Sequence, residues 1–329
     1  MDCRAALTKA PTSAADEQRS CGGGSGVRFS GSGMPSACPA CLEETNTTLV
    51  ETLEDCSFYQ CALCGLQYAD PIPDNVPVFQ DFTDCGLSLL SGLQQGRRVA
   101  CALAPNERLV LHWLRRNIRR NAAILELCCE SGRFLAALDA CGFEPLGMDP
   151  LSRPIAMLRE RGFTVEVGFA EDYPRDWPEP AAVVLLESLV RFPAPTELLE
   201  SIRERFSQAA VCCSVPSPRR SLKVPEFDKR VDYPPHRLTR WTPRALQRAM
   251  EHAGYRAKCR VAHVDLHWRR GSWRARALKI LFALSLRLIG ESEYSIIGIG
   301  FPSRKSCLSR SKSEFHGTDR SVVSGRFLE

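Results

Sequence analysis

Residues 123–149 read AILELCCESGRFLAALDACGFEPLGMD, and this stretch decides the fold class. The apolar run 123–128 predicts a strand buried on both faces, since it has no polar alternation. A tight turn then leads into a helix predicted over 132–141, and a second strand is predicted over 144–149. Strand, turn, helix and strand in this order are the repeating unit of a parallel sheet covered by helices.

The same alternation continues along the chain. Further strands are predicted at 163–168, 182–189, 209–215, 258–264 and 294–301, and further helices at 152–161, 196–206 and 242–253. A preceding amphipathic helix is predicted to begin with Asn106 as its N-cap. The pattern favours a doubly wound, Rossmann-like α/β sheet in one domain over residues 106–302.

Residues 35–75 carry two cysteine pairs, Cys38-x2-Cys41 and Cys61-x2-Cys64, separated by nineteen residues. Two such pairs can place four thiolates tetrahedrally around one zinc ion. Cys56 lies between the pairs and fits no ligand position. With four protein ligands the site is closed, so we expect a structural zinc in a small ribbon. We expect this unit to need the metal to fold, separately from the α/β domain.

Acidic residues stand at the carboxyl ends of the predicted strands, where ligands bind in this architecture. Glu126 ends the first strand and Asp149 the second, where an acid can accept hydrogen bonds from ribose hydroxyls. Glu171 and Asp172 follow the third strand, and Glu187 ends the fourth. Each alone could be a solvated carboxylate, whereas their joint placement indicates a nucleotide site.

The order of these motifs resembles the class I S-adenosylmethionine-dependent methyltransferases, which carry ExGxGxG, a ribose-binding acid and a strand-four motif. The four-cysteine segment looks like one found ahead of some of these enzymes in bacteria, and residues 232–241 (DYPPHRLTRW) resemble a later segment of the same group. The resemblance implies S-adenosylmethionine as cofactor. It also implies binding by the residues at the strand ends: Glu126, Cys128, Glu130, Gly132, Asp149, Glu171, Asp172 and Glu187.

The chain departs from the family pattern at several positions. Of the three loop glycines only Gly132 remains, because Cys128 and Glu130 replace the others. Val190 and Arg191 stand where the family has Glu-His. The acid that usually opens the fourth strand is replaced by alanine, near Ala182. Glycine lets the backbone approach a ligand closely and take positive φ. Two functions therefore stay open: a methyltransferase acting on a small molecule, and an inactive binding or scaffold protein with the same fold.

Methyl transfer often needs a base to deprotonate the acceptor. His236 is the candidate base, because a histidine pKa lies near neutrality, and Tyr233 is a candidate for orienting the acceptor. Both belong to residues 217–241, which follow the fifth strand and are expected to form a lid over the cofactor. The alternative is a loop that only packs there, with His236 in a structural hydrogen bond.

The remaining segments indicate location and partners. Residues 1–34 and 303–329 are expected to be disordered, 76–105 to be a linker, and translation could start at Met1 or Met34. The sixteen cysteines, without a signal peptide, favour reduced thiols and a cytoplasmic protein. Residues 268–290 predict a basic amphipathic helix that covers the pocket, contacts an anionic membrane or docks on nucleic acid. An RNA-modifying methyltransferase is disfavoured, because residues 35–75 contain no Lys or Arg.

Overall fold

The computed structural model describes residues 37–44, 47–54, 56–72, 103–220, 233–234, 236–263 and 293–303. The basic segment 268–290 and the expected linker 76–105, apart from residues 103–105, lie outside these residues. So do the two terminal segments, apart from Ser303, and residues 221–232 and 235 of the expected lid. No helix in the described ranges is long and apolar enough to cross a membrane.

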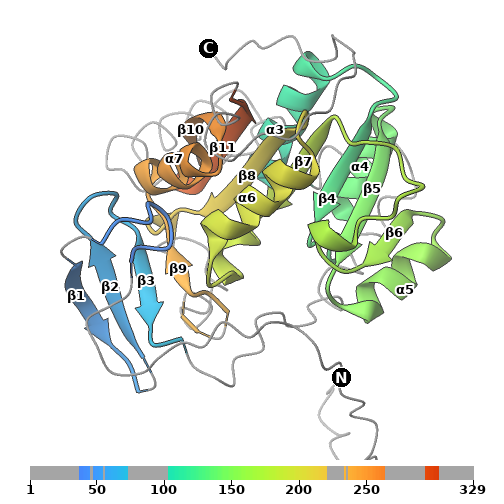
Figure 1. Cartoon of the computed structure of the whole chain (residues 1–329). Coiled ribbons are helices and arrows are strands. Elements are labelled where there is room, and N and C mark those ends of the chain that lie inside the picture. Colours follow the sequence, from blue (N-terminus) through green and yellow to red (C-terminus); the bar gives the residue numbers. More distant parts are fainter. Residues whose placement is uncertain are drawn as a thin grey trace, which may run out of the picture. The chain divides into compact units, whose positions relative to one another are not determined.

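The larger sheet has seven strands in the order β10-β11-β8-β7-β4-β5-β6 (Figure 1). Its five parallel strands are β4 (Ala123–Leu127), β5 (Glu144–Asp149), β6 (Thr164–Val167), β7 (Ala182–Leu186) and β8 (Ala210–Pro216). The antiparallel strands β10 (Tyr255–His263) and β11 (Glu293–Pro302) complete it. The chain winds outward in opposite directions from β4, so the doubly wound sheet is confirmed, with the switch of direction between β4 and β7.

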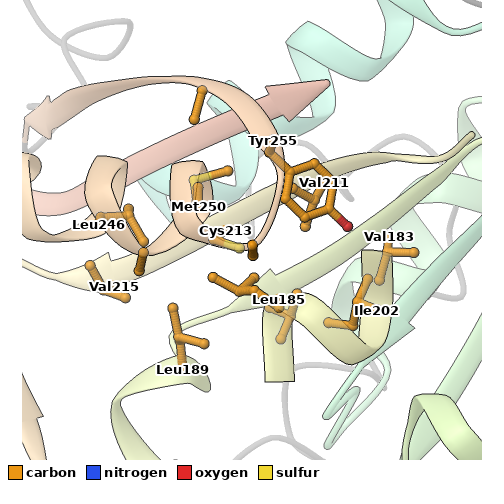
Figure 2. Packing of buried hydrophobic residues seen from close by; sticks show 14 of the residues in the cluster. Val183, Leu185, Leu189, Ile202, Val211, Cys213, Val215, Leu246, Met250 and Tyr255 are labelled. Atoms are coloured by element: carbon orange, nitrogen blue, oxygen red, sulfur yellow. The ribbon is translucent and has the colours of Figure 1, made fainter. Parts of the chain in front are cut away.

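Alternate residues of the buried strands face two helix layers. Leu125 of β4 packs in the cluster that holds α6 (Pro195–Arg205) and α7 (Pro243–His252). Ile124 packs in the cluster that holds α3 (Pro105–Asn117), α4 (Arg133–Ala140) and α5 (Ser152–Glu160). Figure 2 shows part of the first cluster, where Val183 and Leu185 of β7 lie near Ile202 of α6. Burial on both faces explains the near-continuous apolar sequence of these strands.

Helix α3 begins two residues earlier than an Asn106 cap requires. Its N-cap is Ala104, Pro105 takes the first helical position, and the Glu107 carboxylate accepts the Ala104 N–H at 2.6 Å. The prediction of Asn106 as N-cap is therefore wrong. Proline fits the first helical position because its fixed φ suits the helix and no N–H is needed there. The Asn106 side chain is free to bond elsewhere, as described below.

The four-cysteine unit forms a second sheet in the order β1-β2-β3-β9. Strands β1 (Thr47–Thr52), β2 (Ser57–Cys61) and β3 (Gln67–Asp70) come from the unit itself. Strand β9 (Thr239–Arg240) comes from the predicted lid segment and pairs antiparallel with β3. Part of the lid segment is thus built into the sheet of the cysteine unit.

The cysteine unit shares one hydrophobic cluster with the α/β domain. Leu66 and Tyr68 are buried with Trp241 and Leu246 in the cluster that includes β7 and α6. Two threonine hydroxyls tie the cysteine knuckles to helix N-termini. Thr196 of α6 donates to the Pro39 carbonyl at 2.8 Å, and Thr242 donates to the Cys64 carbonyl at 2.8 Å. The cysteine unit and the α/β domain therefore share buried core residues, and separate folding of the unit remains a prediction.

Thr242 provides a direct test of this connection. It is also the N-cap of α7, where its hydroxyl accepts the Ala245 N–H at 3.0 Å. Thr242→Val removes both hydrogen bonds, and we expect it to lower the free energy of unfolding by about 1–3 kcal/mol. Thr242→Ser keeps the hydroxyl and should cost much less. Chemical denaturation monitored by circular dichroism measures both; equal stabilities for the Val and Ser variants would contradict the contact.

Candidate functional site

The loop at residues 128–132 connects β4 to α4 and keeps a glycine-type backbone. Cys128, Glu130 and Gly132 have φ values of 57°, 43° and 70°. These lie in the left-handed region, which costs a non-glycine residue about 1–2 kcal/mol. A Cβ at Gly132 would lie 2.3 Å from the Leu158 Cδ2 atom, so a side chain there would require Leu158 to move. Cys128 and Glu130 do fit their positions, with the Cys128 side chain buried and that of Glu130 45% exposed.

Asp149, at the end of β5, joins the second strand to this loop. Its Oδ2 accepts the Glu130 N–H at 2.9 Å, and its Oδ1 accepts the Leu151 N–H at 3.0 Å. Burial raises the pKa of Asp149, and the two N–H donors partly offset that rise. Each carboxylate oxygen retains a lone pair after one bond, so Asp149 can still accept hydrogen bonds from a ligand hydroxyl.

Glu126 lies on β4, buried beside the same loop. Its Oε2 atom is inaccessible to solvent and has no hydrogen-bond partner in the described part of the chain. Burial is the main cause that raises the pKa of Glu126, followed by repulsion from Glu107. Glu107 itself pairs with Arg133 of α4. A buried carboxylate oxygen without a partner is costly, and a cationic ligand group would satisfy it.

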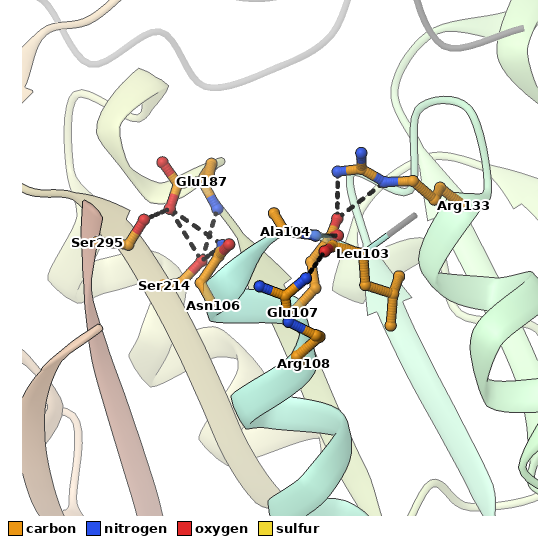
Figure 3. Close-up of polar contacts among 9 residues, drawn as sticks. All are labelled: Leu103, Ala104, Asn106, Glu107, Arg108, Arg133, Glu187, Ser214 and Ser295. Carbon is orange, nitrogen blue, oxygen red and sulfur yellow. Dashed lines mark hydrogen bonds and ion pairs between the residues drawn. The ribbon is translucent and has the colours of Figure 1, made fainter. Parts of the chain in front are cut away.

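Glu187 is the centre of a polar network rather than a solvated carboxylate (Figure 3). Its Oε1 accepts Asn106 Nδ2 at 3.2 Å, Ser214 Oγ at 3.2 Å and Ser295 Oγ at 2.7 Å. Its Oε2 pairs with Arg220 at 3.1 Å. The network joins α3, β7, β8 and β11 at one end of the sheet. Ser214, Ser295 and Arg220 could not be identified from the sequence as partners of Glu187. Only Asn106 carried a signal, because it is a polar residue in the first turn of an amphipathic helix.

Glu171 and Asp172 form most of a short 3-10 helix, η2 (Ala170–Asp172), after β6. Asp172 Oδ2 accepts the Phe169 N–H at 3.0 Å and so caps this turn. The Glu171 carboxylate accepts the Ser201 hydroxyl of α6 at 2.8 Å. Both carboxylates therefore already hold local structure, and a ligand contact by either remains a prediction.

Arg191 forms an ion pair with the 128–132 loop. It ends a second 3-10 helix, η3 (Leu189–Arg191), which follows β7. Its Nη2 lies 2.9 Å from Glu130 Oε1, and the Arg191 side chain is 17% exposed. Two of the departures from the family pattern, Glu130 in the loop and Arg191 after the fourth strand, thus contact each other.

The two candidate catalytic residues lie in different surroundings. The Tyr233 hydroxyl donates to Glu51 of β1 at 3.0 Å. The Arg240 Cζ atom lies 4.4 Å from the centroid of the Tyr233 ring and 4.3 Å from that of the Phe58 ring. Tyr233 is thereby held on the sheet of the cysteine unit. His236 is half-buried, and its backbone N–H donates to the Tyr233 carbonyl at 2.9 Å. Their roles in catalysis remain predictions.

The four cysteines of the two pairs come together as the sequence predicts. Cys38, Cys41, Cys61 and Cys64 are buried, and their sulfur atoms lie within 4.8 Å of one another. The Cys38–Cys64 and Cys41–Cys61 sulfurs are 3.6 and 3.7 Å apart. A tetrahedral site with Zn–S bonds of about 2.3 Å requires sulfurs about 3.8 Å apart. The donor set and its spacing therefore fit a zinc ion.

Comparison with known proteins identifies the class of the α/β domain. Residues 97–259 match a family described as a methyltransferase domain. A chain from the complex that contains the Haloferax volcanii Trm112 methyltransferase activator is 18% identical; the match covers 69% of this chain and all of that one, with a TM-score of 0.45. An S-adenosylmethionine-dependent methyltransferase from Archaeoglobus fulgidus is 20% identical, with 59% and 94% coverage and a TM-score of 0.43.

A Thermotoga maritima S-adenosylmethionine-dependent methyltransferase is 16% identical, with 68% and 99% coverage and a TM-score of 0.45. No curated protein matches the chain. The family match spans β4 to β8, together with the 128–132 loop, Asp149 and Glu187. Residues 97–259, just under half of the chain, therefore form a methyltransferase domain.

Proposed function

We propose that the chain transfers a methyl group from S-adenosylmethionine to a small-molecule acceptor, with the cofactor at the carboxyl ends of β4, β5 and β7. The observation that carries this proposal is the buried Glu126 Oε2 atom, which lacks a partner among the described residues. The ammonium group of the cofactor is a cation of the kind this oxygen requires. Ligands in open α/β sheets bind beside the point where the strand order reverses, and Glu126 lies there on β4.

Asp149 and the residues of the 128–132 loop support the same placement. Asp149 would accept hydrogen bonds from the ribose hydroxyls, while Cys128, Glu130 and Gly132 form the turn around the cofactor. When bound, S-adenosylmethionine supplies an electrophilic methyl group on its sulfonium. In-line attack depends mainly on positioning, which the turn and the two carboxylates provide. Four atoms of other residues already contact the Glu187 carboxylate, so Glu187 acts in this proposal by holding the end of β7 in place.

His236 is the proposed base for an acceptor hydroxyl or amine. Tyr233, bonded to Glu51, would position His236 through the peptide hydrogen bond between them. A small molecule is favoured over RNA because residues 35–75 hold seven acidic residues and no Lys or Arg. A surface of that charge repels phosphates.

Asp149 is tested by calorimetric titration with S-adenosylhomocysteine. Hydrogen bonds to a charged acceptor contribute about 1.5–3 kcal/mol each, so Asp149→Ala should weaken binding at least about tenfold. Asp139→Ala, an exposed acid near the end of α4, is the matched control and should bind like the wild type. Tight wild-type binding that does not change in Asp149→Ala would contradict the placement. No binding by the wild type would favour the scaffold function.

Glu126 predicts a pH effect with a defined sign. The pKa of Glu126 is raised in the free protein, and a cation beside it lowers that pKa. At a pH between the pKa of Glu126 in the complex and its higher pKa in the free protein, binding of S-adenosylhomocysteine should release a proton. In that pH range the affinity should rise with pH. Calorimetry in two buffers of different ionisation enthalpy counts the protons. Glu126→Gln should abolish the release, and proton uptake or no proton exchange by the wild type would contradict the role.

We also propose that the four cysteines hold one structural zinc ion. Freshly purified protein should contain about one zinc per chain by elemental analysis. Cys41→Ser should lower the zinc content and the stability of the whole domain, because the cysteines belong to its shared core. Cys56→Ser is the matched control, since Cys56 is also buried but lies outside the four-sulfur cluster. Zinc-free wild-type protein, or equal loss in both variants, would overturn the assignment.

A further inference from the structure

The ion pair between Glu130 and Arg191 joins two segments that the cofactor site requires. Glu130 sits in the middle of the 128–132 loop, whereas Arg191 lies after β7, on the opposite side of β4 from Asp149. Their charged atoms are 2.9 Å apart, and Arg191 is mostly buried. A partly buried pair is screened less by solvent than one on an open surface.

The backbone of Glu130 needs such a restraint. Its φ of 43° is unfavourable for any residue with a Cβ, so the loop would relax if nothing held it. Relaxation would have a direct consequence, because the Glu130 N–H is the donor to Asp149 Oδ2. Turning this peptide away would release the carboxylate proposed to bind the ribose.

Arg191 is itself anchored from the other side. Its N–H donates to the Ser188 carbonyl at 3.0 Å within η3. The carbonyl of the preceding residue, Val190, accepts the Leu238 N–H at 2.9 Å and lies 3.4 Å from the Thr239 hydroxyl. Thr239 belongs to β9, which pairs with β3 of the cysteine unit. The guanidinium therefore comes from a segment whose backbone is fixed by a second sheet.

We propose that the Glu130–Arg191 pair is a latch that holds the 128–132 loop in its left-handed conformation, the conformation that glycine adopts without restraint. Glu130 and Arg191 are then positioning residues for the cofactor, acting through the Glu130 peptide and Asp149. This inference rests on the proposed function. It explains how a loop with two non-glycine residues at positive φ can keep a cofactor-binding shape.

The test combines single variants with a glycine background. Glu130→Gln and Arg191→Gln should each weaken S-adenosylhomocysteine binding by about threefold to tenfold, the range expected when a partly buried ion pair is lost. The charge-exchanged protein, with Glu130→Arg and Arg191→Glu together, should recover much of the loss. In a Glu130→Gly background, Arg191→Gln should have no further effect, because glycine needs no latch.

Glu179→Gln is the matched control. Glu179 forms an exposed ion pair of 3.2 Å with Arg205 of α6, and its loss should leave the dissociation constant unchanged. Affinity that is unchanged in Glu130→Gln and Arg191→Gln would overturn the latch. So would an Arg191→Gln effect of the same size in the Glu130→Gly background, since Arg191 would then act by another route.

Amide hydrogen exchange separates failure of the latch from failure of the proposed function. The Glu130 N–H should exchange about threefold to tenfold faster in Arg191→Gln than in the wild type, with or without a cofactor. A wild type that binds no S-adenosylhomocysteine refutes the proposed function. Exchange at Glu130 that is equal in wild type and Arg191→Gln refutes the latch, whatever the binding result.

Discussion

Burial of β4 on both faces determines where the α/β domain can place its polar groups. Ile124 and Leu125 enter two different hydrophobic clusters, so neither face of the strand can carry polar chemistry. Polar side chains are confined to the end of the strand, where the chain turns into α4. Glu126 and the loop at 128–132 are placed there by the same burial that stabilises the sheet.

The polar groups at this edge support one another through backbone as much as through side chains. Asp149 holds the Glu130 peptide, and Glu187 gathers Asn106, Ser214 and Ser295 beneath the end of β7. Neither carboxylate acts as an isolated charge. The site is therefore positioned by a buried hydrogen-bond network, in which loss of one partner would leave another unsatisfied.

Much of this could be predicted from the sequence. The apolar strands, the two cysteine pairs and the acids at strand ends are local patterns, and the first two are confirmed in the fold. Contacts between distant segments could not be predicted, since nothing in the spacing of Glu130 and Arg191 indicates that they meet. Two further features depend on tertiary pairing of the same kind. These are the addition of β9 to the cysteine sheet and the shift of Asn106 from a cap to a network.

The proposed site requires the 128–132 loop to bind S-adenosylmethionine although only Gly132 of its glycines remains. A crystal structure of the chain grown with S-adenosylhomocysteine tests it most directly. We expect ligand density at the carboxyl ends of β4 and β5, with its ammonium at Glu126 and its ribose at Asp149. We also expect Cys128 and Glu130 to keep their positive φ values. Density elsewhere on the domain, or a loop rebuilt around the ligand with Arg191 turned away from Glu130, would contradict the proposed site and the Glu130–Arg191 latch.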